Sequence, residues 1–140
     1  MRKVFSIIAL VVVLFGTAQI VEPVKWSAKV VKLSESEFDL ITSATIEEGW
    51  HLYSQFTPDG GAMPLVLKYT AQKGNYQLIG KTKESKYKKS YNEIFEIDEY
   101  YFVGSATFIQ RIKLINSAFK TINVNVAGQA CIEGKCVPTE

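Results

Sequence analysis

Hydrophobic and polar side chains alternate in short stretches along most of the chain, and this period of two predicts β-strands with one buried face. The alternation is clearest in residues 38–46, 65–70, 106–114 and 122–126, and weaker in residues 26–30 and 76–78. Turn-forming Gly, Pro, Asn, Asp and Ser residues separate these stretches. Roughly seven or eight short strands with regular turns predict an all-β fold: an immunoglobulin-like antiparallel β-sandwich, with a small barrel as the alternative.

One segment interrupts the alternation. Residues 81–89 hold five lysines and a single acidic residue, Glu84. For the charges themselves we expect a solvated loop that leads into a polar strand. The aromatic residues Tyr87, Tyr91 and Phe95 lie in or just after this segment. Aromatic side chains placed between charges can cover another part of a molecule, so the segment is also a candidate cover for a site.

The first 18 residues have the pattern of a cleaved signal peptide, and an uncleaved anchor is the alternative. The apolar run within them is too short to cross a bilayer as a helix. We therefore expect residues 1–18 to be a signal peptide and residues 19–140 to form one exported domain. The pattern consists of a basic start, an apolar run and small residues before a cut at Gln19, namely Arg2 and Lys3, residues 4–15, and Gly16 and Ala18.

The overall charge does not point to nucleic acid as a partner. The chain has 16 Lys and Arg residues against 14 Asp and Glu, and the predicted signal peptide holds two of the basic residues and none of the acidic ones. The expected mature domain is therefore formally neutral, so its charge gives no argument for nucleic-acid binding. Its length suffices for one hydrophobic core that does not depend on a disulfide.

Cys131 and Cys136 are the two cysteines of the chain. In an oxidising compartment such a close pair is either a structural disulfide or a redox couple. A bond between them requires the chain to turn back, and Gly134 makes such a turn easy. So short a loop would gain about 2 kcal/mol from the bond, against about 4 kcal/mol for a loop of ~60 residues, which makes a purely structural role inefficient.

Reactivity of the pair depends on its thiolate form. Lys135, beside Cys136, would favour the thiolate, and Glu133 would oppose it. The spacing is not that of a thioredoxin Cys-x-x-Cys site, so spacing alone leaves the redox and the structural interpretations open.

Other chemistry is weakly supported by the sequence. His51 is the sole histidine, and no serine or cysteine can be tied to it from the sequence, so we interpret it as a strand-end residue packed between Trp50 and Leu52. Two cysteines and one histidine do not complete a four-ligand zinc site, so no metal is expected.

Four segments resemble the N-terminal periplasmic domain of the DsbD thiol:disulfide interchange proteins. They are the sequences VKWS at residues 24–27, GWHLYS at 49–54, NEIF at 92–95, and the paired cysteines with a following proline at 129–138. The last segment is the most specific, and the resemblance covers most of residues 24–138. That family usually continues with another strand, so a domain that lacks its last strand is one expectation for residues 19–140.

The resemblance implies a periplasmic thiol:disulfide oxidoreductase component without a cofactor other than its redox-active disulfide. Such domains relay electrons from a membrane-embedded thiol:disulfide reductase domain to periplasmic thioredoxin-like proteins. By analogy, Cys136 would be the thiolate that attacks the partner's disulfide, and Cys131 would resolve the mixed disulfide. The alternative is a non-catalytic exported β-sandwich that binds a partner, with Cys131–Cys136 as a structural disulfide.

The resemblance also implies a cover over the cysteine pair, because the family covers its site with an aromatic-bearing loop. The matching segment runs from about Tyr87 to Tyr91, with lysines near the place of the family's capping phenylalanine. We expect Tyr87 or Tyr91 to close over the disulfide and Tyr53 to line its other side. The alternative is that both tyrosines of the segment are ordinary surface aromatics.

Overall fold

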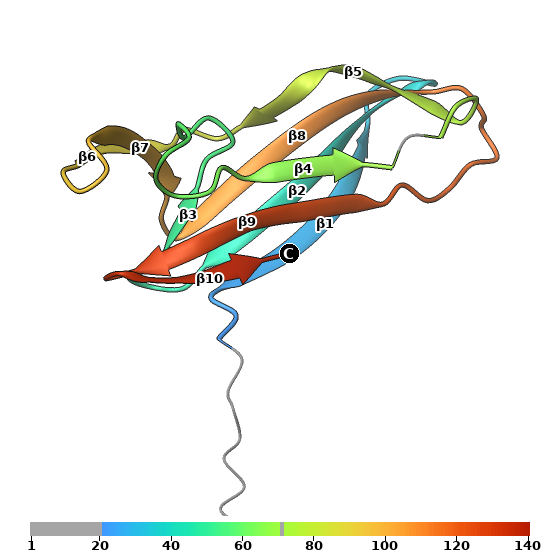
Figure 1. Ribbon diagram of the computed structural model, residues 1–140. Helices are drawn as coiled ribbons and strands as arrows, with labels where there is room; N and C mark the ends of the chain where they lie inside the picture. Colours follow the sequence, from blue (N-terminus) through green and yellow to red (C-terminus); the bar gives the residue numbers. More distant parts are fainter. Residues whose placement is uncertain (1–20, 71) are drawn as a thin grey trace, which may run out of the picture.

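The computed structural model describes residues 21–70 and 72–140, so the predicted signal peptide lies outside the described residues. The described chain forms ten β-strands and no helix (Figure 1). None of its elements is therefore a helix of the length and apolarity needed to cross a membrane. In chain order the strands are β1 (Val24–Lys32), β2 (Glu37–Ile46), β3 (His51–Tyr53), β4 (Val66–Tyr69), β5 (Tyr76–Glu84), β6 (Lys88–Asn92), β7 (Ile97–Phe102), β8 (Ser105–Leu114), β9 (Val124–Ile132) and β10 (Lys135–Thr139).

The strands form two antiparallel sheets. The first has the order β1-β2-β8-β5, and the second has the order β10-β9-β3-β7-β6, with β4 joined to the far half of β9. Figure 1 shows the two sheets packed face to face, each with its own edges. The expected antiparallel β-sandwich is therefore confirmed, and the sheet does not close into a barrel.

The core between the sheets follows from the alternation along the strands. On β8, every second residue from Ala106 to Ile112 is buried. Phe108 and Leu52, from opposite sheets, are completely buried. The Phe102 ring meets the Phe108 ring edge-on with 5.7 Å between their centroids. Burial of such side chains is the main favourable contribution to folding, and it exceeds the contribution expected from so short a disulfide loop.

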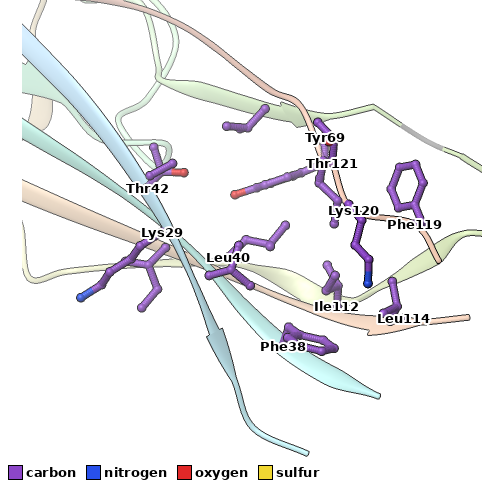
Figure 2. A pocket seen from close by; sticks show the side chains of 15 residues that line it. Lys29, Phe38, Leu40, Thr42, Tyr69, Ile112, Leu114, Phe119, Lys120 and Thr121 are labelled. Carbon is purple, nitrogen blue, oxygen red and sulfur yellow. The ribbon is translucent and has the colours of Figure 1, made fainter. Parts of the chain in front are cut away.

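The edges of the two sheets are joined on one side of the sandwich. The indole nitrogen of Trp26 on β1 donates a hydrogen bond of 2.8 Å to the Thr139 hydroxyl on β10. Past this point β1 continues, and Val30 on its inward-facing side is 64% exposed. An apolar cavity of about 430 Å³ opens here, and Figure 2 shows Leu40, Tyr69 and Ile112 among the side chains that line it. The sandwich is therefore closed at the end that carries the cysteines and open at the other.

Candidate active site

Cys131 and Cys136 lie directly opposite each other in the β9–β10 hairpin. Two residues, Glu133 and Gly134, form its turn with φ angles of 38° and 77°. Positive φ at both central residues is the geometry of the type I′ turn, whose twist matches that of the flanking strands. The turn sets the register that pairs the two cysteines, whose sulfurs form a disulfide with Cα atoms 4.1 Å apart.

The disulfide lies on the outer face of the second sheet, away from the main core. Ala130 is completely buried between the sheets, and strand alternation turns the neighbouring Cys131 to the other side. There Cys131 forms a small buried cluster with Tyr53 and Ala62, against which Tyr101 packs. The two cysteines consequently differ: Cys131 is only 8% exposed, whereas Cys136, on the edge strand, is exposed.

The segment of residues 54–65 contributes Ala62 to the cluster around Cys131 on this outer face. At its start, the Ser54 hydroxyl donates a hydrogen bond to the Glu84 carboxylate, and the Gln55 backbone N–H donates to the same group at 3.1 Å. Gly61 lies so close to β7 that a Cβ atom on it would be 2.7 Å from Ile97 Cδ1. This close approach brings Ala62 into the cluster around Cys131.

His51 is the neighbour of Cys131 on the other side. It lies opposite Cys131 in the pairing of β3 with β9, so β10, β9 and β3 carry Cys136, Cys131 and His51 in one row across the sheet. The His51 ring stacks on Tyr101 with 4.2 Å between their centroids. Partial burial and the positive charge of Lys88 lower the pKa of His51, against the opposing effect of Glu99.

This position corrects the sequence-based interpretation of His51. Trp50 and Leu52 point into the core, whereas His51 lies between them in sequence only and is half-buried on the opposite face. The sequence did not show its relation to Cys131, because the β3–β9 pairing joins residues far apart in the chain. The one clue in the sequence was the alternation of side chains along a strand, which places His51 on the face opposite to that of Trp50 and Leu52.

The structure brings Tyr53, but not Tyr87 or Tyr91, to the cysteine pair. In the second sheet β6 is separated from β9 by β7 and β3, which amounts to about 14 Å at ordinary strand spacing. Tyr87 stacks on Tyr100, with centroids 4.8 Å apart, and packs against the core between the sheets. Tyr91 is 60% exposed. The expected cover is corrected accordingly: Ala62 and Tyr101 occupy the place beside Cys131 that we had assigned to Tyr87 or Tyr91.

Lys135 also lies differently from the expected arrangement. It is the first residue of β10, so strand alternation directs it to the face opposite that of Cys136. Its charge is exposed to solvent, where screening weakens its effect on a neighbouring thiol. Among residues 21–70 and 72–140 there is no group of His, Cys, Asp and Glu side chains suited to hold a metal ion.

The fold and the site together define a β-sandwich protein with a disulfide on the outer face of one sheet, at the sheet edge. The model of the family described as "Thiol:disulfide interchange protein DsbD, N-terminal" matches residues 18–140, and the chain belongs to that family. This confirms the family resemblance inferred from the cysteine segment. No curated protein sequence matches the chain significantly.

A solved structure with a similar fold is the N-terminal periplasmic domain of ScsB from Proteus mirabilis. The two share 16% sequence identity and superpose with a TM-score of 0.54 over 83% of this chain. The match covers 43% of the other chain, so this protein spans less than half of that structure. The similarity supports the two-sheet sandwich as the common fold.

Proposed function

We propose that this protein is a periplasmic thiol:disulfide interchange domain that relays electrons through Cys131 and Cys136. Membership of the DsbD N-terminal family implies a general role in thiol:disulfide interchange. The proposed donor is a membrane-embedded thiol:disulfide reductase domain, and the proposed acceptors are periplasmic thioredoxin-like proteins. The observation that carries the proposal is the unequal exposure of the two cysteines of one disulfide.

This inequality assigns different roles to the two sulfurs. A donor thiolate reaches the exposed Cys136, forms a bond to its sulfur and breaks the Cys131–Cys136 bond, whose electron pair goes to the Cys131 sulfur. A second donor thiol then releases the fully reduced domain. In the opposite half of the cycle, the Cys136 thiolate attacks the acceptor's disulfide, and Cys131 displaces the acceptor as a dithiol. Two electrons and two protons pass through the domain in each cycle.

Trapping tests these roles. Cys131→Ser leaves Cys136 able to hold a partner in a mixed disulfide, whereas Cys136→Ser leaves only the covered Cys131. We expect the first variant to accumulate a covalent complex with a purified periplasmic thioredoxin-like protein and the second to accumulate little. The double variant is the control. Equal trapping by both single variants would refute the assigned roles.

The reduction potential tests the alternative, a binding module whose disulfide is only structural. Structural disulfides of exported proteins have potentials below about −300 mV, and exchangeable ones lie higher. The interchange role therefore predicts a value above this limit, measured by equilibration with a dithiol buffer. A lower value, together with no trapping by either variant, would favour the structural role.

We also propose that residues 1–18 direct export and that the mature domain begins near Gln19. The support is the signal-peptide pattern and the similarity of the fold to the N-terminal periplasmic domain of ScsB. N-terminal sequencing of protein from the native host checks this proposal, and an intact Met1 on cytoplasmic protein would contradict it.

A further inference from the structure

In the proposed cycle, reduction of the Cys131–Cys136 bond leaves its electron pair on the Cys131 sulfur, which is poorly solvated. Cys131 is 8% exposed and is surrounded by Tyr53, Ala62 and Tyr101. An anionic sulfur in such surroundings loses most of its hydration, so the thiolate is disfavoured relative to the thiol. A proton must therefore reach Cys131 when the disulfide is reduced and must leave when Cys131 attacks a mixed disulfide.

The side chains around Cys131 differ in their ability to carry this proton. Ala62 has no ionisable group. Burial raises the pKa of Tyr53 above its ordinary value near 10, with further contributions from Glu99 and Tyr101, so its hydroxyl does not exchange a proton near neutral pH. His51 is the one residue of the chain with an ordinary pKa between 5 and 8.

The strand pairing places His51 beside Cys131 on the same face of the sheet. His51 lies opposite Cys131 in the β3–β9 pairing, and directly opposed residues have Cβ atoms about 4.5–5.5 Å apart. The stack on Tyr101 holds the His51 ring against the outer face of the sheet. His51 is half-buried and Cys131 is buried, so the imidazole is more accessible to solvent than the neighbouring cysteine is.

We propose that His51 transfers the proton of Cys131: it accepts the thiol proton when Cys131 attacks a mixed disulfide on Cys136, and it passes a proton taken up from solvent to the Cys131 sulfur when the Cys131–Cys136 bond is reduced. The inference rests on the proposed interchange function. In the attacking step the Cys131 sulfur forms a bond to the Cys136 sulfur, the partner sulfur leaves with the electron pair, and the proton of Cys131 goes to the imidazole.

The charged and titratable surroundings fit this direction of transfer. Lys88 of β6 and Glu99 of β7 act on the pKa of His51 in opposite senses, and the Tyr101 ring stacks on it. Tyr53 lies two residues along β3 on the same face, and Cys131 and Cys136 lie in the same row on β9 and β10. Burial is the largest effect and lowers the pKa of His51, so the ring is neutral at pH 7 and free to accept a proton.

A partner-free reaction isolates the step. Reduced protein is mixed with an excess of the aromatic disulfide 5,5′-dithiobis(2-nitrobenzoate), which releases one coloured thiolate when Cys136 reacts and a second when Cys131 displaces the adduct. We expect His51→Phe, which keeps a ring against Tyr101, to slow the second release at pH 7 by at least about tenfold. The first release should be unchanged and serves as the internal control.

The pH dependence separates proton transfer from packing. At high pH Cys131 loses its proton to hydroxide, so the difference between wild type and His51→Phe should disappear. His51→Gln, which hydrogen-bonds but does not titrate in this range, should behave like His51→Phe and provides a second variant if the first fails to fold. An equal second release in all three proteins, or a defect that persists unchanged at high pH, would overturn the proposal.

The two proposals can fail separately. The aromatic disulfide replaces any protein partner, so the His51 measurement does not depend on the identity of the donor or acceptor. Failure to trap a thioredoxin-like protein would reject the relay while leaving the result for His51 intact, and an inert His51 would leave the relay intact.

Discussion

At the scale of single residues, the molecule protects one sulfur of its disulfide and exposes the other. Tyr101 contributes to this protection, because its ring packs against the cluster of Cys131 and stacks on His51. Tyr91 has the same chemistry, but it is exposed and lies on β6. The two tyrosines therefore form a matched pair for testing which aromatic side chain shields the site.

We expect Tyr101→Ala to increase the rate at which iodoacetamide alkylates Cys131 by several-fold. The measurement uses the reduced protein with Cys136→Ser, so that Cys131 is the only thiol, at a pH high enough to ionise it. Tyr91→Ala is the control and should leave the rate unchanged. Acceleration by Tyr91→Ala alone would restore the cover that we first expected from residues 87–91.

At the scale of elements, the segment of residues 54–65 is the candidate cover of the site, because it places Ala62 beside Cys131. It is fixed at its start by the hydrogen bonds to Glu84, and it approaches β7 closely at Gly61. Cover and disulfide come from parts of the chain far apart in sequence, so the cover depends on the correct packing of the second sheet. A substitution at Gly61 should therefore change the accessibility of Cys131.

We expect Gly61→Val to lift this segment, because its Cβ atom would lie 2.7 Å from Ile97 Cδ1 and 3.0 Å from Glu99 Oε1. The free energy of unfolding should fall by about 1–3 kcal/mol, and alkylation of Cys131 should become faster. Gly60→Ala is the control: it strains a backbone with φ of 107° but meets no atom within 4 Å. Slower or unchanged alkylation in Gly61→Val would show that the segment does not cover Cys131.

The elements also show what the sequence could predict. The long alternating stretches correspond to β2, β8, β4 and β9, because burial of one face of a strand requires an apolar residue at every second position. β3 has only three residues, and β6 is polar, so neither carries a period that can be recognised. The cysteine pair and the need for a bend at Gly134 were predictable because both are local in sequence.

The surroundings of the pair were not predictable in this way. Ala62 and His51 reach Cys131 through the fold of the second sheet, and nothing in the neighbouring residues marks that contact. The expectation for Tyr87 and Tyr91 came from the position of the covering loop in other members of the family. The strand order of the second sheet keeps that segment away from the cysteines, because β7 and β3 lie between them.

At the scale of the whole molecule, the hydrogen bond from Trp26 to Thr139 joins the edges of the two sheets. Thr139→Val keeps the shape of the side chain but leaves the partly buried indole N–H without this acceptor. We expect the free energy of unfolding in urea to fall by about 1 kcal/mol. Thr45→Val, at an exposed position of β2, is the control. An equal loss in both variants would mean that the bond between the sheets contributes nothing specific.

The open cavity beyond Thr139 has a consequence for motion. At the cysteine end the backbone is held by β10, by the segment of residues 54–65 and by the disulfide, whereas the second half of β1 packs on its neighbour β2 with little covering it. Amide protons of residues 28–32 should therefore exchange with deuterated water through local openings, well before those of β8. Local opening at this end can therefore occur without disturbing the structure around the disulfide, which lies at the opposite end of the sandwich.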